Sequence, residues 1–251
     1  MLPKLVIFDI DNTLTRSKQP VTADMAVLLE QLACITEVAF ISGGTLEQLL
    51  VQVAEHLSPA TDFSKIHILP TSGGALYDFK NGSWEMVYEE RLTDAQAQAI
   101  AEALKQGAIA TGLIDFSDSS YGNRIEARGA QVTLSALGQE APIDQKTLWD
   151  PTGEKRHTLR EAIAALLPDY DVKQGGATSI DVTKKGINKA YGIRALSTHA
   201  GIPIVDMLYV GDALFEGGND AVVKETGIKT HAVEDPDDTQ RFIRELIREI
   251  Q

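Results

Sequence analysis

Four apolar residues at positions 5–8 lead directly into two aspartates, Asp9 and Asp11. Such a run is too short for a buried helix and is typical of a strand that is covered on both faces, as in a parallel sheet. Because alternate side chains of an extended segment point the same way, we expect Asp9 and Asp11 to stand side by side at the strand end. Two such carboxylates repel one another unless a proton or a cation separates them. The alternative is an ordinary solvated turn that ends a strand.

Other short apolar runs alternate with amphipathic helical patterns. The predicted strands cover residues 5–8, 38–41, 66–69, 207–210 and 228–233, and the predicted helices begin near Thr22 and Thr45 and cover 187–198 and 236–250. The pair Asn81-Gly82, between residues 75–80 and 83–88, is a strong hairpin signal. Strands that alternate with helices predict an α/β fold with a Rossmann-like, doubly wound parallel sheet.

The pattern changes between residues 89 and 185. Strand-like runs at 123–128, 131–137, 170–173 and 178–182 surround two helical stretches, 93–106 and 152–167. Grouped strands that bracket helices favour an antiparallel α+β layer over further βαβ units. The sequence therefore predicts an α+β cap domain at 89–185, inserted into a core domain formed by 1–88 and 186–251.

The charge balance limits the partners of this chain. Its 251 residues include 23 basic and 36 acidic side chains, which gives a formal net charge of -13. Nucleic acids and anionic membranes both require a cationic surface, so neither is an expected partner. A small phosphorylated ligand would also be repelled, so any site for it must be built locally from cations.

The single cysteine and the first residues bear on the cellular compartment. Cys34 excludes an internal disulfide and fits a reducing compartment; it falls in an apolar helical pattern and is expected to be buried. Residues 1–4 lack the features of a signal peptide, and no apolar run reaches the 18 residues of a membrane span. We expect a cytoplasmic protein.

Polar residues follow three of the predicted strands. Asp9 and Asp11 follow the first, Ser42 and Gly43 the second, and Asp212 follows the strand at 207–210. Carboxyl ends of parallel strands meet at one edge of a sheet, so these residues are expected to share a crevice. A phosphate held there adds negative charge to several carboxylates, which a divalent cation offsets, and oxygen ligands favour Mg²⁺. Gly43 and Gly44, which follow Ser42, are equally explained by a tight turn between a strand and a helix.

These residues resemble a known set of motifs. The pattern Asp9-x-Asp11-x-Thr13, then Ser42, then a lysine such as Lys189, then Gly211-Asp212 with Asn219-Asp220, resembles the four motifs of the haloacid dehalogenase superfamily of phosphotransferases, subfamily IIB. The resemblance covers the whole chain in the right order, and four separated motifs are far more specific than one.

The resemblance implies a role for each motif residue. Asp9 is the expected nucleophile, Asp11 the acid and base, and Lys189 a catalytic cation, although Lys184 or Lys185 are alternatives. Asp9, the Asp11 carbonyl and Asp212 are the expected Mg²⁺ ligands. Ser42, Gly43 and Asn219 are expected to bind the phosphate or to orient the groups that do.

A closer likeness is to eukaryotic-type phosphomannomutases. It is carried by residues 211–220, by Glu126 to Arg128 with Ser135 and Gly138 downstream, and by residues 175–182. It implies that the cap residues Arg128, Ser179 and Asp181 contact the substrate. Gln139 and Lys146 stand where that family has arginines, and neither matches the planar charged fork of arginine.

Three functions are therefore weighed. The first is a Mg²⁺-dependent phosphatase of a small phosphorylated metabolite such as a sugar phosphate, acting through an aspartyl-phosphate. The second is a phosphomannomutase-type phosphohexomutase, and the third is a non-catalytic phosphosugar-binding protein. A homodimer is possible with any of them.

Overall fold

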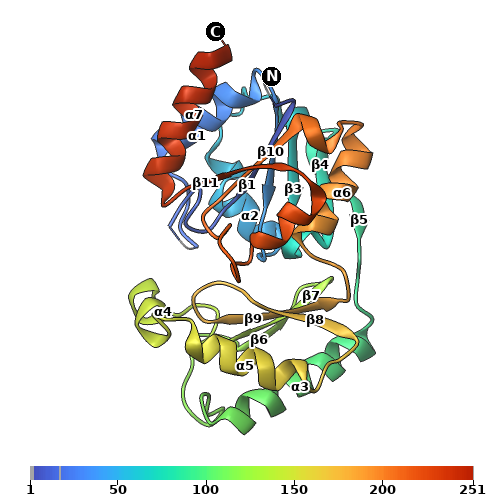
Figure 1. Cartoon of the computed structure of the whole chain (residues 1–251), viewed down its shortest axis with the longest axis vertical. Coiled ribbons are helices and arrows are strands. Elements are labelled where there is room, and N and C mark those ends of the chain that lie inside the picture. The colour runs from blue at the N-terminus through green and yellow to red at the C-terminus, as the bar shows by residue number, and fades with distance from the viewer. Residues whose placement is uncertain (1–2, 17, 251) are drawn as a thin grey trace. The chain divides into compact units, whose positions relative to one another are not determined.

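The protein is described by a computed structural model in which residues 3–16 and 18–250 are placed (Figure 1). The chain divides into two compact units. The first comprises Met1–Glu89 and Asn188–Gln251, and the second comprises Glu90–Ile187.

A seven-stranded sheet forms the centre of the first unit, and β1 is one of its inner strands. The strand order is β11-β10-β1-β2-β3-β4-β5. Five strands are parallel, namely β1 (Leu5–Asp9), β2 (Glu37–Ile41), β3 (Ile66–Leu69), β10 (Met207–Gly211) and β11 (Lys229–Ala232). The antiparallel hairpin of β4 (Ala75–Lys80) and β5 (Ser83–Glu89) closes one edge, turning through Asn81 and Gly82, which both have positive φ. The predicted α/β class with a mainly parallel sheet is confirmed.

Helices cover both faces of this sheet. They are α1 (Ala23–Ala33), α2 (Leu46–Gln52), α6 (Lys189–Ala200) and α7 (Pro236–Ile250). Val6 and Phe8 pack in one core with side chains of α1, α2 and α7, whereas Leu5 and Ile7 pack in another with Ile193 of α6. Alternate residues of β1 are thus buried on opposite faces, which explains why its sequence is apolar throughout.

Short 3₁₀ helices occupy several connections of the first unit. They are η1 (Ala54–His56), η2 (Phe63–Lys65), η3 (Thr71–Gly73), η4 (Ile204–Asp206) and η5 (Ala221–Thr226). The segment after Asp220 is the six-residue 3₁₀ helix η5.

Threonine side chains begin the helices as predicted. Thr22 accepts a hydrogen bond from the Met25 N–H at the start of α1. Thr45 and Gln48 form a reciprocal capping box before α2. The expectation of a buried Cys34 is wrong: this residue is exposed, because it lies at the C-cap of α1, beyond the buried stripe.

The second unit is an antiparallel α+β layer. Its sheet has the order β6-β7-β9-β8, formed by β6 (Ile125–Ala127), β7 (Gln131–Ser135), β8 (Tyr170–Gln174) and β9 (Ser179–Lys184). Its helices are α3 (Asp94–Thr111), α4 (Ile143–Trp149) and α5 (Glu154–Ala164). Val132 and Ile180 pack with side chains of α3 and α5, such as Leu104 and Leu159. The seven-residue α4 was not predicted, because a helix of that length shows little periodicity.

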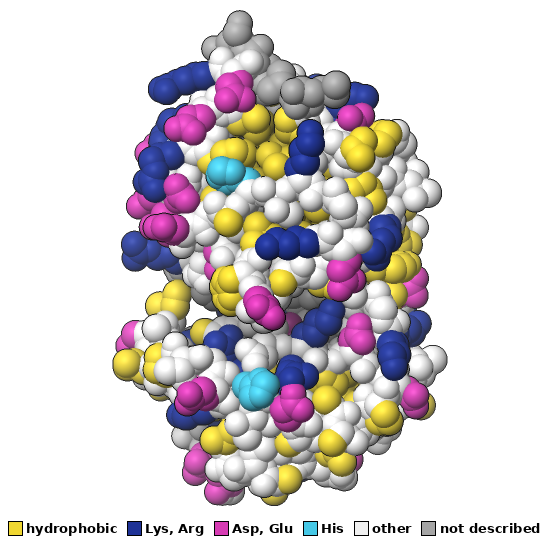
Figure 2. Space-filling view, viewed as in Figure 1, with side chains coloured by type: hydrophobic (Ala, Val, Ile, Leu, Met, Phe, Trp, Pro, Cys, Tyr) yellow, Lys and Arg dark blue, Asp and Glu magenta, His cyan; other side chains and the backbone are white. Residues whose placement is uncertain are grey.

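Two surface properties bear on the expected partners. On the face drawn in Figure 2, lysine and arginine side chains are interspersed with aspartate and glutamate. Among the described residues, none of the helices combines the length and the apolar character that crossing a membrane requires.

Candidate active site

The carboxyl ends of three neighbouring strands bring polar residues to one edge of the parallel sheet. Asp9 is the last residue of β1, Ser42 follows β2, and Asp212 follows β10. The register pairs Phe8 with Val210 and Asp9 with Ile41, so these ends lie level with one another. This edge is where open α/β sheets bind ligands.

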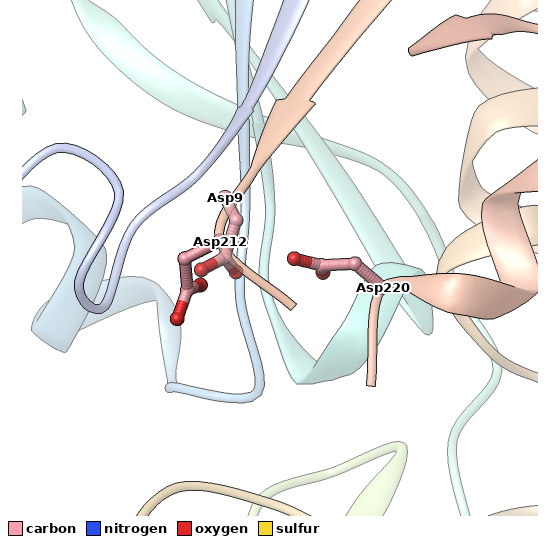
Figure 3. Close-up of side chains that lie close together, drawn as sticks. All are labelled: Asp9, Asp212 and Asp220. Atoms are coloured by element: carbon pink, nitrogen blue, oxygen red, sulfur yellow. The ribbon is translucent and has the colours of Figure 1, made fainter. Parts of the chain in front are cut away.

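Three carboxylates gather there (Figure 3). One oxygen each of Asp9, Asp212 and Asp220 lies within 4.8 Å of the other two. Asp9 and Asp220 are buried and Asp212 is half-buried. Burial raises the pKa of Asp9 well above its usual value, and the charges of Asp220 and Asp212 raise it further against the opposing effect of Lys189. Burial and Asp220 likewise raise the pKa of Asp212. The cluster therefore favours the entry of positive charge.

A buried lysine holds two of these carboxylates. Lys189 is the first residue of α6, behind the N-cap Asn188, whose side chain accepts from the Tyr191 N–H. Its ammonium donates to Asp9 Oδ1 at 2.5 Å and to Asp220 Oδ1 at 2.6 Å. Burial alone lowers the pKa of Lys189, but the two carboxylates outweigh this effect and raise it. The lysine is therefore charged at neutral pH.

The alternative lysines lie elsewhere. Lys184 ends β9 in the second unit, with its ammonium 4.0 Å from a Glu90 carboxylate oxygen, and Lys185 is exposed. Of the three lysines considered, Lys189 is the one that contacts Asp9.

Thr13 fixes Asp212. The Thr13 hydroxyl accepts from the Asp212 N–H at 3.0 Å and donates to Asp212 Oδ1 at 3.3 Å. Thr13 is fully buried in the turn that follows β1, so this pair joins the ends of β1 and β10. The threonine of the first motif thus positions the aspartate of the last.

Asp220 is bound entirely by the protein's own donors. Its Oδ1 accepts from Lys189 and from the Tyr209 hydroxyl, and its Oδ2 accepts from the Ala213 N–H. Asp9 and Asp212 are therefore the better candidates for metal ligands. Asn219, next to Asp220, is exposed.

Asp11 departs from the expected arrangement. Strand β1 ends at Asp9, so the alternation of side chains that predicts a neighbouring pair stops before Asp11. Its Oδ1 instead accepts from the Lys18 N–H at 2.8 Å and from Gln52 Nε2 at 3.2 Å. Asp11 is half-buried and is not part of the three-carboxylate group.

The loop after β2 is held by a second, strained loop. Ser42 Oγ accepts from the Gly44 N–H, and Gly43 between them is half-buried. Thr71 N–H donates to the Gly44 carbonyl and Ser72 N–H to the Ser42 carbonyl. Thr71 and Ser72 both have positive φ, a costly conformation that marks functional segments in many proteins.

The second unit holds the remaining predicted residues. Ser179 and Asp181 lie on the polar face of its sheet, and Asp181 accepts from the buried hydroxyl of Thr133 at 2.8 Å. The side chain of Arg128 is 5% exposed and donates to Glu126 at 2.7 Å and to Gln139 Oε1 at 2.9 Å.

The residues of the first unit fit a hard divalent cation. Three carboxylates and one ammonium leave two formal negative charges at the cluster. The available ligand atoms are carboxylate oxygens, which Mg²⁺ and Ca²⁺ prefer.

A family model for eukaryotic phosphomannomutase matches residues 25–249. The chain belongs to this family. Among its relatives, the phosphomannomutase of Encephalitozoon cuniculi is 25% identical over 256 residues, covering 98% of this chain and 94% of that protein. The phosphomannomutase of Saccharomyces cerevisiae is 25% identical over 255 residues, covering 96% and 93%.

Solved structures share the fold of this phosphomannomutase-family chain. A haloacid dehalogenase-like hydrolase from Bacteroides thetaiotaomicron has a TM-score of 0.65 at 16% identity and covers 97% of this chain and 99% of that one. An IMP-bound, N-terminally truncated IMP-nucleotidase from Plasmodium falciparum has a TM-score of 0.69 at 14% identity, covering 98% and 68%. The family match, together with this shared fold, confirms the predicted membership of the haloacid dehalogenase superfamily.

Sequence reasoning missed one polar group of this phosphomannomutase-family site. Tyr209 was treated as an apolar strand residue, yet its hydroxyl lies 3.2 Å from the Lys189 ammonium. The available signal was a tyrosine in an otherwise apolar strand two residues before Gly211, since a buried tyrosine usually has a polar partner.

Proposed function

We propose that this protein is a Mg²⁺-dependent phosphotransferase that hydrolyses a small phosphorylated metabolite, such as a sugar phosphate, through a phosphorylated Asp9. The observation that carries the proposal is the contact between Lys189 and Asp9 Oδ1 beside Asp212. It combines a buried carboxylate nucleophile, a fixed cation and a second acidic ligand.

Asp9 is the proposed nucleophile. One of its oxygens forms the new bond to phosphorus, and the bond from phosphorus to the alcohol oxygen of the substrate breaks. Lys189 holds Oδ1, which orients the carboxylate before the reaction. Burial raises the pKa of Asp9, so nearby positive charge is required to keep it ionised and reactive.

Asp9, the carbonyl of Asp11 and Asp212 would hold Mg²⁺. The ion, when bound, supplies positive charge that offsets the repulsion between the nucleophile and the phosphate.

Asp11 is the proposed acid and base. It gives its proton to the alcohol oxygen that leaves and later takes a proton from the water that attacks the phosphorylated Asp9. The hydrogen bonds from Lys18 N–H and Gln52 fix its carboxylate at the start of this cycle. Ser42 and Gly43 would bind the transferred oxygens, and the charge of Lys189 would stabilise them at short range. Asn219 is proposed to bind the phosphate or to orient the groups that do.

The second unit is the proposed substrate-specificity cap. Arg128, Ser179 and Asp181 are its proposed substrate contacts. Arg128 is already neutralised by Glu126 and holds Gln139, which brings no charge of its own. Lys146 is buried and donates to the Gln139 carbonyl at 3.1 Å. This set offers less free positive charge for a second phosphate than two arginines would.

Hydrolysis is therefore favoured over the mutase reaction, in which Asp9 returns the phosphoryl group to another hydroxyl of the same sugar. The mutase stands as the second candidate because the matching relatives are phosphomannomutases. Cytoplasmic location and a homodimer stay predictions from the sequence.

A screen separates the two reactions. The purified protein is incubated with Mg²⁺ and a panel of sugar monophosphates, with and without a sugar bisphosphate, and both free phosphate and isomerised sugar are measured. Release of phosphate without the bisphosphate supports the phosphatase. Isomer formation that depends on the bisphosphate, with little free phosphate, would replace it with the mutase. Neither product from any substrate would contradict both reactions.

A further inference from the structure

Tyr209 connects the two halves of the buried ion pair. Its hydroxyl donates to Asp220 Oδ1 at 2.6 Å and accepts from the Lys189 ammonium at 3.2 Å. The side chain is fully buried, with its ring in the core of the first unit that also contains Ile7 and Ile193. The hydroxyl is therefore the polar end of a core residue and lies between the carboxylate of Asp220 and the ammonium of Lys189.

The sheet explains how Tyr209 reaches this position. Tyr209 is paired with Ile7 across β1 and β10, and Asp9 follows Ile7 on the same face of β1. Gly211 occupies the corresponding place on β10. A Cβ atom there would lie 2.4 Å from Asp220 Oδ2 and 2.9 Å from Tyr209 Cε1. The missing side chain of Gly211 makes the room in which the ring and the carboxylate meet.

The donors of Lys189 are fully assigned. An ammonium has three N–H donors, and those of Lys189 reach Asp9, Asp220 and Tyr209. Asp9 and Asp220 both accept hydrogen bonds from the ammonium of Lys189, so its position depends on both carboxylates. The tyrosine hydroxyl binds both Lys189 and Asp220, so it restricts rotation of the ammonium and fixes the carboxylate that anchors it.

We propose that Tyr209 is a positioning residue, whose hydroxyl clamps Asp220 and Lys189 so that the ammonium stays on Asp9. This inference rests on the proposed function. A purely structural tyrosine would need only one partner for its buried hydroxyl, whereas this one joins two charged groups of the site. Tyr209 therefore acts on the transferred group only through Lys189.

The test removes only the hydroxyl. Tyr209→Phe keeps the ring, and Tyr170→Phe is the matched control, because Tyr170 packs against the hydrophobic core of the second unit. Orthovanadate and inorganic phosphate, each with Mg²⁺, are titrated into the three proteins by calorimetry. Vanadate imitates the transferring phosphoryl group, and phosphate imitates the bound product.

A misplaced Lys189 weakens contacts that form in the transition state more than those of the ground state. We expect Tyr209→Phe to weaken vanadate binding about tenfold and to lower kcat for p-nitrophenyl phosphate about tenfold, a typical effect of one hydrogen bond to a charged group. Phosphate affinity and KM should change less than about twofold, and Tyr170→Phe should match the wild type within the same factor.

Equal vanadate affinity in Tyr209→Phe and wild type would overturn the inference, as would wild-type protein that binds no vanadate. Absence of phosphate release by a wild-type protein that still binds vanadate overturns the proposed function alone. The double variant Tyr209→Phe with Asp220→Asn gives a second, independent measure of the clamp. Its vanadate affinity should equal that of Asp220→Asn within about twofold, since the clamp is already broken; full additivity of the two changes contradicts the clamp.

Discussion

Gly73 and Gly192 lie so close that a Cβ atom on either residue would come within 2.8 Å of the Cα of the other. Gly192 is in the first turn of α6, three residues after Lys189. Gly73 ends the strained segment that is hydrogen-bonded to Ser42 and Gly44. The contact therefore joins the helix that carries Lys189, the proposed catalytic lysine, to the loops proposed to bind phosphate.

Gly192→Ala tests this close approach. Alanine is the better helix former by about 1 kcal/mol, but overpacking typically costs about 1–3 kcal/mol. We expect a net loss of about 1 kcal/mol in the free energy of unfolding, measured by urea titration. Gly176→Ala is the control, because a Cβ at Gly176 meets nothing within 4 Å. A Gly192→Ala protein more stable than the wild type would show that the contact is not tight.

Lys189→Met tests the assignment of the catalytic lysine. It leaves Asp9 and Asp220 buried without their cation, and breaking such a pair typically costs about 3–5 kcal/mol. We expect that loss of stability together with at least a hundredfold fall in kcat. Lys185→Met, at an exposed position, should leave both properties unchanged. A larger fall in kcat in Lys185→Met than in Lys189→Met would assign the catalytic role to Lys185.

Mg²⁺ binding should depend on Asp212. We expect the ion to stabilise the folded protein by about 2.7 kcal/mol at a concentration of 100 times its Kd, and EDTA should remove this gain. Asp212→Asn should weaken Mg²⁺ binding at least tenfold in calorimetry. Asp206→Asn is the control, because Asp206 pairs with Lys4 at 2.9 Å. Wild-type affinity in Asp212→Asn would exclude this residue as a ligand.

A buried histidine predicts how stability varies with pH. His67 lies between Asp78 at 2.7 Å and Glu37 at 3.0 Å. Burial alone lowers the pKa of His67, but these partners raise it above its ordinary 6.5. Burial alone raises the pKa of Asp78, but hydrogen bonds from His67 and His199 outweigh it and hold that pKa well below its ordinary 3.8.

The signs of the two shifts set the pH window. The raised histidine pKa contributes stability that is present below pH 6.5 and is lost as the pH rises through the folded value. The depressed aspartate pKa contributes stability that is present above pH 3.8 and is lost as the pH falls. His67→Gln should flatten the decline above pH 6.5 in urea titrations, whereas exposed His56→Gln should not. An unchanged slope in His67→Gln would contradict this account.

Local rules explain what the sequence predicted well. The continuous apolar run of β1 requires cover on both faces, and Thr45 with Gln48 specifies a helix start whatever lies around it. The placement of Asp9 and Asp212 at one edge follows from parallel strands alone.

The rest depends on tertiary structure. The alternation of side chains along a strand does not predict where the Asp11 side chain points, because β1 ends before this residue. The exposure of Cys34 could not be predicted, because an apolar periodicity does not reveal where the helix leaves the core. The role of Tyr209 depends on Gly211 and on Asp220, which folds back from a loop eleven positions later.

Phosphorylation of Asp9 is the central claim, and trapping the intermediate tests it most directly. Borohydride reduces an acyl phosphate to an alcohol, so mass spectrometry of the peptide containing Asp9 reports the modification after incubation with Mg²⁺ and a turned-over substrate. The account predicts a reduced Asp9 in the wild type and neither modification nor turnover in Asp9→Asn. Full turnover by Asp9→Asn, or a reduced aspartate or glutamate at a position other than 9, would contradict it.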